Sequence, residues 1–188
     1  MRKVIAAINM TLDGFCDHTL IEPDEEIHDH YKDLLNDAGV ILYGRITYQL
    51  MQFWQGLVEN PSGEKSMDDF AEAIDKIPKI VFSNTWKNEG PATTGWHSAQ
   101  LSHQTLEEKV LTLKQQPGNN IFVGSRSLII QLLNLNLIDE LQLCIHPVIA
   151  GAGLPLFEDI NNRTTLKLIT TKTFGEGAVI FYYEPKKD

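Results

Sequence analysis

The sequence lacks several features that define specialised classes of protein. It has only two cysteines, Cys16 and Cys144, and no Cys-x-x-Cys pair, so neither a disulfide framework nor a cysteine zinc site is indicated. No stretch approaches the ~20 consecutive apolar residues that a membrane span needs. The start of the chain has no long apolar region followed by the small-residue cleavage site of a signal peptide. We therefore expect a soluble, cytoplasmic protein without a membrane partner.

Basic residues are also scarce. The 188 residues include 16 Lys and Arg against 25 Asp and Glu, which gives a formal net charge of −9. Nucleic acids bind to clustered cations, so this balance argues against a nucleic-acid partner. An anionic cofactor is still compatible, because backbone N–H groups and one or two arginines can hold a phosphate. The length and the 43% hydrophobic content are those of an ordinary globular chain, and we expect residues 1–188 to form one domain.

Predicted strands and helices alternate along most of the chain. Short apolar runs indicate buried strands at residues 4–10, 40–43, 79–82, 121–123 and 140–145. Apolar residues at helical spacing predict helices at 24–38, after residue 44, and at 70–77, 106–115 and 128–137. Two further strands, 166–173 and 178–183, are joined by a Gly-containing link typical of a hairpin. Residues 87–102 are predicted to be mostly loop, with a short edge strand that starts at Trp96 or lies beside it. This order predicts an α/β fold with a mainly parallel sheet, helices on both faces and an antiparallel hairpin at its C-terminal edge.

One predicted strand ends at Gly44 and leads directly into a helix. Such a turn presents free backbone N–H groups to an anion, while Arg45 adds a charged fork and Thr47 adds a hydroxyl at the start of the helix. This is the chemistry that a dinucleotide phosphate needs. The alternative is a plain strand-to-helix turn with a solvent-exposed arginine.

The same pattern recurs where a later strand ends at Gly124. Ser125 and Ser127 are able either to cap the next helix or to bind a phosphate, and Arg126 is able to offset its charge. Ser83 follows a third buried strand, where a turn-forming role is the alternative to ligand binding. In open α/β sheets the carboxyl ends of the parallel strands are where ligands bind, so these turns together predict a cofactor that carries phosphate.

Other polar residues are candidates for catalysis or metal binding. Asp13 follows the first strand, where it is able to donate or relay a proton, or simply to form an Asp-Gly turn. His28 and His30 share a predicted helix, but residues two apart point about 200° away from each other, so we predict no metal site. His146 is interpreted as a strand histidine with structural partners rather than as a catalytic group.

In their order along the chain, these segments resemble the dihydrofolate reductase-like superfamily, and specifically its bacterial branch similar to the C-terminal reductase domain of riboflavin biosynthesis, RibD. Residues 6–14 resemble the Ser-Leu-Asp-Gly opening of that branch, and residues 44–48 resemble its Gly-Arg-x-Thr turn, which receives NADPH phosphate. Residues 121–128 correspond to a Gly-Gly phosphate loop, and 139–157 to the closing strand and loop. The resemblance implies a three-layer α/β/α fold.

The resemblance also implies roles for individual residues. It implies an NADPH site formed by Ala7, Gly44, Arg45, Thr47, Ser83, Gly124, Ser125, Arg126, Ser127 and Leu128. Asp13 is the predicted catalytic group beside the two reacting rings. The resemblance places Asp24, His28 or Asp29 where relatives hold the substrate, and the sequence does not choose among them. We expect the substrate to be a small heterocycle. A homodimer is also predicted.

Two departures from the family pattern narrow the expected function. The second phosphate loop reads Gly124-Ser125 instead of Gly-Gly, and a Cβ at Ser125 would narrow the approach of the backbone to a pyrophosphate. The residues after Thr47 lack the Asp-Asp-Pro-x-Leu-x-x-Arg pattern that binds ribityl phosphate in riboflavin reductases, which favours a pterin-like or unknown substrate over the pyrimidine. The leading hypothesis is an NADPH-dependent reductase. The alternative is a non-catalytic member that binds nucleotides or serves as a dimeric scaffold.

Overall fold

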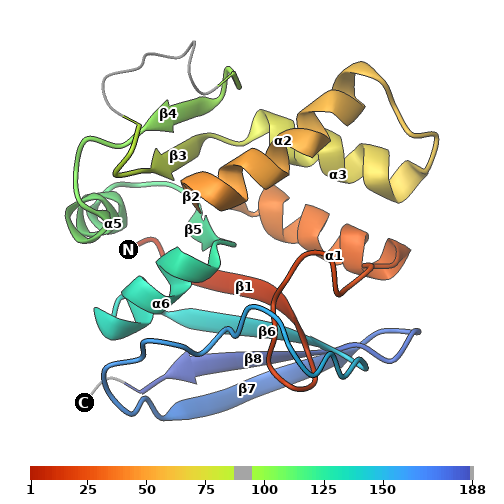
Figure 1. Ribbon diagram of the computed structural model, residues 1–188. Coiled ribbons are helices and arrows are strands. Elements are labelled where there is room, and N and C mark those ends of the chain that lie inside the picture. The colour runs from red at the N-terminus through yellow and green to blue at the C-terminus, as the bar shows by residue number, and fades with distance from the viewer. Residues whose placement is uncertain (87–94, 187–188) are drawn as a thin grey trace.

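A computed structural model describes residues 1–86 and 95–186 of the chain (Figure 1). Its strands are β1 (Val4–Thr11), β2 (Ala38–Gly44), β3 (Lys79–Phe82), β4 (Ala99–Leu101), β5 (Asn120–Val123), β6 (Glu140–His146), β7 (Leu166–Thr173) and β8 (Val179–Pro185). In the described part of the chain they form one eight-stranded sheet in the order β4-β3-β2-β5-β1-β6-β8-β7. Strand β1 lies inside the sheet between β5 and β6, so its backbone pairs with strands on both sides.

The sheet is parallel from β4 to β6 and antiparallel beyond it. Strand β8 pairs antiparallel with β6, and β7 pairs antiparallel with β8. The link between β7 and β8 contains Gly177, whose φ of +90° is a conformation that glycine adopts readily. The predicted mainly parallel sheet with an antiparallel C-terminal hairpin is confirmed.

Helices cover both faces of the sheet, which confirms the three-layer prediction (Figure 1). They are α1 (Glu25–Asn36), α2 (Arg45–Glu59), α3 (Lys65–Lys76), α5 (Leu106–Gln115) and α6 (Arg126–Asn134). Apolar residues of α5 and α6 pack on one face of the sheet, and those of α1, α2 and α3 pack on the other. Within residues 1–86 and 95–186, no helix combines the length and the hydropathy needed to cross a membrane.

The helices differ at their N-termini. Helix α1 is capped by the Asp24 carboxylate, and α5 by a reciprocal pair of bonds between Thr105 and Glu108. Helices α2 and α6 begin after Gly44 and Ser125, and neither has a side-chain cap hydrogen bond. Because α2 and α6 each follow a parallel strand, their uncapped N–H groups lie at the carboxyl edge of the sheet.

One predicted boundary was wrong. The first helix was expected to continue until Gly39, but α1 ends at Asn36 and Gly39 lies within β2. A Cβ at Gly39 would lie only 2.9 Å from the Arg2 guanidinium and 3.2 Å from the carbonyl oxygen of Asn119, so glycine is needed for close approach rather than for helix termination. In the segment predicted as mostly loop, the edge strand expected at or beside Trp96 is β4, which begins at Ala99 and pairs with β3 at the sheet edge. Residues 87–94 of this segment lie outside the described part.

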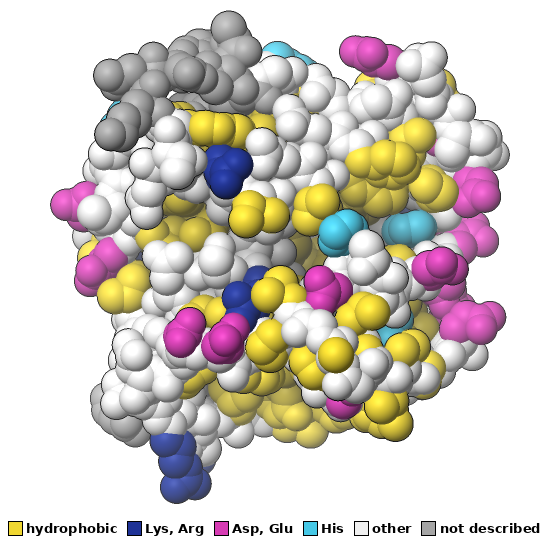
Figure 2. Space-filling model, viewed as in Figure 1, with side chains coloured by type: hydrophobic (Ala, Val, Ile, Leu, Met, Phe, Trp, Pro, Cys, Tyr) yellow, Lys and Arg dark blue, Asp and Glu magenta, His cyan; other side chains and the backbone are white. Residues whose placement is uncertain are grey.

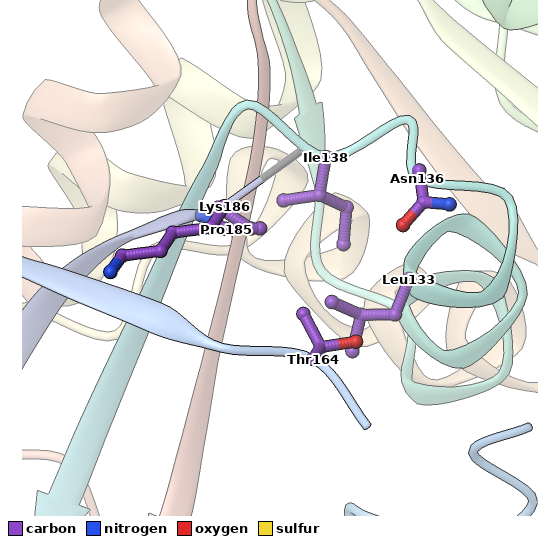
Figure 3. A pocket seen from close by; sticks show the side chains of 6 residues that line it. All are labelled: Leu133, Asn136, Ile138, Thr164, Pro185 and Lys186. Atoms are coloured by element: carbon purple, nitrogen blue, oxygen red, sulfur yellow. The ribbon is translucent and has the colours of Figure 1, made fainter. Parts of the chain in front are cut away.

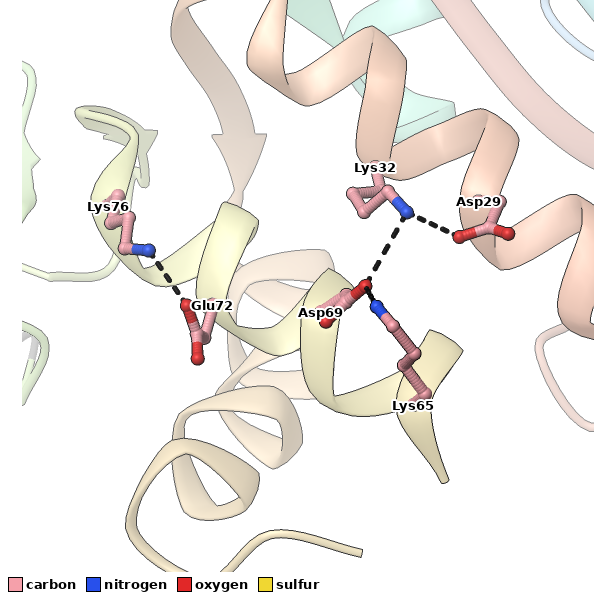
Figure 4. Close-up of polar contacts among 6 residues, drawn as sticks. All are labelled: Asp29, Lys32, Lys65, Asp69, Glu72 and Lys76. Atoms are coloured by element: carbon pink, nitrogen blue, oxygen red, sulfur yellow. Dashed lines mark hydrogen bonds and ion pairs between the residues drawn. The ribbon is translucent and has the colours of Figure 1, made fainter. Parts of the chain in front are cut away.

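Ion pairs lie within and between helices α1 and α3 on one face of the sheet, and one of them, Lys32–Asp69, joins the two helices (Figure 4). Lys32 of α1 lies 2.5 Å from Asp29 on its own helix and 3.7 Å from Asp69 of α3. Asp69 also pairs with Lys65, and Lys76 pairs with Glu72 at 2.8 Å. Most of these side chains are solvent-exposed, whereas Lys32 and Asp69 are partly buried. Exposed pairs of this kind contribute at most about 1 kcal/mol each. Apolar packing, rather than these pairs, holds the layer in place.

Candidate functional site

A pocket of about 660 Å³ opens at the carboxyl edge of the sheet, where β2, β3 and β4 end. This volume lies within the range of small-molecule sites in proteins. Its walls come from three strand-to-helix connections and from the turn after β3. The lining residues are Gly44, Arg45, Ile46, Thr47, Phe82, Ser83, Asn84, Thr85, Ser102, His103, Gln104, Thr105, Leu106, Ser127, Leu128 and Gln131.

The turn at Gly44 faces the pocket, as the sequence predicted. Its backbone N–H donates a hydrogen bond of 2.9 Å to the buried Ser125 hydroxyl, so this donor is already occupied. A Cβ at Gly44 would lie 3.0 Å from Ser127 Oγ and 3.5 Å from Ser125 Oγ. The two strand-to-helix turns therefore touch each other. Arg45 and Thr47 line the pocket at the uncapped start of α2.

The turn at Gly124 divides its side chains between the pocket and the interior. Ser127 and Leu128 line the pocket, whereas Ser125 is completely buried. Arg126 points to the loop after β6, donating to the Pro155 carbonyl oxygen at 2.6 Å and pairing with Glu158 at 2.6 Å. Ser125 was expected either to cap α6 or to bind phosphate, but its hydroxyl accepts from the other turn instead.

Ala7 connects this turn to the centre of the sheet. It is buried on β1, and its carbonyl oxygen lies 3.9 Å from the position that a Cβ on Gly124 would take. Neither Ala7 nor Gly124 lines the pocket. The strand-to-helix turn at Gly124 therefore lies next to β1 at Ala7.

Hydroxyl and amide groups make up the far wall of the pocket. Ser83 lies there, and its hydroxyl oxygen accepts hydrogen bonds from the backbone N–H groups of Thr85 and Trp86 at 3.2 and 3.1 Å. The turn-forming role considered for Ser83 is therefore observed. Its Oγ also lies 3.3 Å from Oγ1 of Thr85, and either hydroxyl is able to be the donor, so Thr85 and a ligand compete for the Ser83 hydroxyl hydrogen.

The positive charge at the pocket comes from one arginine and from two helix N-termini. Among the described residues that line it, Arg45 is the single lysine or arginine, and its guanidinium contacts Gln49 at 3.3 Å. On the face of the molecule drawn in Figure 2, lysine and arginine side chains are few and stand apart from one another. The uncapped N-termini of α2 and α6 add partial positive charge at the same edge. The pocket thus suits an anion that takes one guanidinium and several backbone donors.

Asp13 lies outside the pocket and joins two loops. Its carboxylate accepts hydrogen bonds from the Thr11 hydroxyl at 2.7 Å and from the backbone N–H groups of Ala150 and Gly151 at 3.1 and 2.7 Å. These bonds, that of Thr11 foremost, lower the pKa of Asp13 to about 2. At neutral pH the group is ionised and has no proton to donate. Gly14 follows with a φ of +94°, as an Asp-Gly turn requires.

The two predicted substrate residues point in different directions. Asp24 caps α1 by accepting from the Ile27 N–H at 2.9 Å. His28 packs edge-on against Trp54 of α2, with ring centroids 5.6 Å apart, and beside Phe70 of α3. Burial lowers the pKa of His28, so the uncharged ring is favoured. His28 therefore belongs to the contact between helices, whereas Asp24 lies at the end of α1.

A polar network on the α1 side of the sheet was missed from the sequence. Asn9 Oδ1 on β1 lies 3.1 Å from the Tyr31 hydroxyl of α1 and 3.2 Å from Nε2 of His146 on β6. Cys144 Sγ lies 3.6 Å from the same nitrogen. The available signal was a polar residue, Asn9, inside an otherwise apolar strand.

Elsewhere, the described chain has a much smaller cavity and no group of metal ligands. A second cavity, lined by Leu133, Asn136, Ile138, Thr164, Pro185 and Lys186, has a volume of about 10 Å³ (Figure 3). That is room for roughly one water molecule. Within residues 1–86 and 95–186, no group of three or more His, Cys, Asp or Glu side chains is placed to hold a metal ion. The carboxyl edge of the sheet is the candidate site.

The family model for the RibD C-terminal domain matches residues 2–180. The chain belongs to the RibD C-terminal domain family. It is 37% identical over 186 residues to the uncharacterized protein YyaP of Bacillus subtilis, covering 97% of this chain and 94% of that protein.

Solved structures share the fold of this RibD-family chain at lower identity. A putative riboflavin biosynthesis protein from Shewanella sp. PV-4 superposes with a TM-score of 0.74 at 18% identity, covering 98% of this chain and 99% of that one. The deaminase/5-amino-6-(5-phosphoribosylamino)uracil reductase of Thermotoga maritima gives 0.64 at 16% identity, covering 98% of this chain but 57% of that protein. These similarities establish the dihydrofolate reductase-like fold.

The Gly-to-Ser departure in this RibD-family chain has a structural explanation. The Ser125 side chain turns inward to Gly44, and its Cβ does not project into the pocket. The Ser125 Cβ therefore does not narrow the approach of a pyrophosphate to the backbone from the pocket, contrary to what the sequence led us to expect. The N–H of Gly44 donates to Ser125, however, so this backbone group is not available to a phosphate.

Proposed function

We propose that this protein is an NADPH-dependent reductase of a small heterocycle. The observation that carries the proposal is the pocket of about 660 Å³ into which Arg45 and the uncapped start of α2 both project. A dinucleotide phosphate needs backbone N–H groups and a guanidinium in one place. Membership of the RibD C-terminal domain family supports the same reaction type.

The residues present fit the cofactor. Arg45 supplies a bidentate fork for a 2′-phosphate, and the free N–H groups at the start of α2, with the Thr47 hydroxyl, supply donors for the pyrophosphate. Ser83, Ser127 and Leu128 line the remainder of the binding surface. When bound, NADPH supplies the hydride. The protein binds and orients the two partners and excludes water.

Residues of the second turn act indirectly in this proposal. Ser125 holds the Gly44 turn in shape, and Arg126 holds the loop after β6. Ala7 is buried beside the Gly124 turn, where β1 passes the strand-to-helix turns, and we infer that the reacting end of the cofactor lies near this point. Asp13, ionised and bound to two loop N–H groups, fixes the adjoining loop rather than supplying a proton.

The substrate class follows from relatives and from what the site contains. The Thermotoga maritima relative is named for reducing a phosphoribosylaminouracil, and we infer a related pyrimidine or pterin-like ring here. On the α1 side, Asp24, Asp29 and Glu64 surround His28, so this region disfavours a second phosphate. A homodimer and a cytoplasmic location remain our predictions, and gel filtration with light scattering tests the first.

A non-catalytic nucleotide-binding protein is the second candidate. The specific observation in its favour is that Asp13, the predicted catalytic group, has its pKa lowered to about 2 and its oxygens occupied. Such a protein would bind NADPH in the same pocket without turning it over.

Calorimetric titration with NADPH and NADH tests the proposal. We expect micromolar binding with a preference for NADPH, followed by oxidation of NADPH in the presence of a reducible pyrimidine or pterin. Binding without oxidation across such a panel would support the non-catalytic candidate. Absence of binding to both nucleotides would show that the chain shares only the fold with its reductase relatives.

A further inference from the structure

The Asn9 side chain is held in one orientation by groups from two other elements. Its Oδ1 atom lies 3.1 Å from the Tyr31 hydroxyl on α1 and 3.2 Å from His146 Nε2 on β6. Tyr31 donates its hydroxyl hydrogen to Oδ1, and among the described residues this hydrogen bond is the one that the structure gives to that hydroxyl. Two contacts on one oxygen fix both the position and the rotation of the amide.

The direction of the amide follows from the Tyr31 proton. Burial raises the pKa of Tyr31 well above its ordinary value, so the phenol keeps its hydrogen and must donate it. Asn9 therefore presents its oxygen inward, and His146 must donate to the same oxygen through Nε2–H. If the amide were reversed, its NH₂ group would face the phenol, and the hydroxyl hydrogen would lose its acceptor.

This arrangement leaves the amide nitrogen of Asn9 without a protein partner among the described residues. Asn9 is partly exposed, and Nδ2 makes no hydrogen bond with any residue of the described chain. It is also not enclosed, because the fully buried unpaired side-chain atoms of the described part are His30 Nε2 and Gln142 Oε1. The two N–H donors of this amide are thus held in place through its oxygen and are not used by the described part of the protein.

The position of Asn9 places those donors beside the proposed reaction centre. Asn9 lies two residues after Ala7 on β1, so the two side chains are on the same face of the strand. Two residues of a strand span about 7 Å, so Asn9 is that much nearer to the carboxyl edge of the sheet. Ala7 in turn lies against the Gly124 turn. A ring stacked on the reacting end of the cofactor would lie between these points and α1.

We propose that Asn9 determines specificity by donating a hydrogen bond from Nδ2 to a ring carbonyl oxygen of the substrate, with Tyr31 and His146 as positioning residues. The chemical class selected is a dioxo or oxo heterocycle, such as a pyrimidinedione or an oxopteridine. A ring with amino groups in place of the carbonyls would meet two facing donors and be rejected. The inference rests on the proposed function, since it takes the reacting ring to bind beside Ala7.

Two matched probes test this selection. Lumazine (2,4-dioxopteridine) carries ring carbonyls, and 2,4-diaminopteridine has the same ring with amino groups. Their affinities are measured by calorimetry with the full-length protein, both alone and saturated with NADP⁺. We expect the wild-type protein to prefer lumazine. In Asn9→Leu the affinity for lumazine should fall about tenfold or more, while that for the diamine changes less than about threefold.

Further variants separate specificity from folding. Asn9→Asp replaces the donor by an acceptor of the same shape, so the preference should reverse toward the diamine. Tyr31→Phe removes one of the two contacts that fix the amide. The affinity for lumazine should fall several-fold, but the protein should still prefer lumazine to the diamine. Asn162→Asp adds the same charge at an exposed loop position and should change neither affinity. The ¹⁵N NMR signals of His146 should show the Nε2–H tautomer, which Asn9→Leu should release.

The outcomes distinguish this inference from the proposed function. Equal weakening of both probes in Asn9→Leu, or binding of neither probe to the wild-type protein, overturns the role of Asn9. NADPH binding is measured in each variant and should stay within about twofold of wild type. If NADPH binds and lumazine is insensitive to Asn9, the inference fails and the proposed function stands. If lumazine depends on Asn9 but NADPH does not bind, the ring site stands and the cofactor proposal fails.

Discussion

The two strand-to-helix turns at Gly44 and Gly124 have similar sequences but different surroundings. Both follow a buried strand, both start a helix without a side-chain cap, and both carry an arginine within two residues of the glycine. At the first turn, Arg45 lines the pocket. At the second, Arg126 is tied to Pro155 and Glu158, and the neighbouring serine is buried.

The difference shows that one motif can serve two purposes in one sheet. The Gly44 turn keeps its charged side chain available, so it is the turn suited to recognise an anion. At the Gly124 turn, two polar side chains bind to other parts of the protein. Ser125 holds the Gly44 turn, and Arg126 holds the loop after β6. Ligand recognition and support of the site are therefore separated between the two turns.

The largest effect is expected from Arg45→Ala. Loss of a charge-assisted contact to a 2′-phosphate should raise the dissociation constant for NADPH about 30- to 100-fold, or roughly 2–3 kcal/mol, while that for NADH changes less than about threefold. Calorimetry with both nucleotides measures the difference. Arg45→Lys keeps the charge but loses the fork, and should recover only part of the affinity. Equal losses for NADPH and NADH would contradict a contact to the 2′-phosphate.

Ser125→Ala should reduce stability more than ligand affinity. The substitution leaves the Gly44 N–H buried without its acceptor, which costs about 1–3 kcal/mol in the free energy of unfolding. Denaturant unfolding followed by circular dichroism measures the loss. Ser127→Ala is the matched control, because this exposed hydroxyl does not bond to Gly44, and it should change the unfolding free energy by less than about 0.5 kcal/mol. Identical stability of the two variants would refute the supporting role of Ser125.

The smallest effect is expected from Arg126→Ala. Its bonds to Pro155 and Glu158 are partly exposed, so their loss should lower the free energy of unfolding by about 0.5–1.5 kcal/mol. The ratio of NADPH to NADH affinity should stay unchanged, in contrast to Arg45→Ala. Glu158→Gln, which keeps the bond to the Pro155 carbonyl, should lose less stability. A drop in NADPH preference as large as that of Arg45→Ala would remove the distinction between the two turns.

Much of the fold could be predicted from local patterns. The runs at 79–82, 106–115 and 166–173 gave the bounds of β3, α5 and β7, because apolar periodicity and flanking turn residues act over short distances. Gly39 was misinterpreted as a helix stop, since its close approach to Arg2 and Asn119 involves residues distant in sequence. The short edge strand β4 was predicted only as a strand at or beside Trp96, without bounds, because three residues carry too little periodicity.

The candidate site was predictable in part. The Gly44 turn, Ser83, Ser127 and Leu128 were predicted as cofactor-binding residues and line the pocket, although their binding role is still a prediction. The use of Asp13 as a loop anchor was not predicted, because its partners lie 137 and 138 residues away. Asn9 was overlooked for the same reason, since its significance depends on groups from α1 and β6.

The sequence by itself determined the alternation of strands and helices, the antiparallel hairpin at the end, and the glycines that terminate β2 and the strand before α6. These are decided by side-chain periodicity and backbone freedom within a few residues. Only the tertiary structure decided how polar groups are used. Ser125 and Gly44 are 81 residues apart, and His146 and Asn9 are 137 apart, yet each pair forms one contact. Such pairings depend on strand order in the sheet, because neighbours in the sheet are not neighbours in the chain.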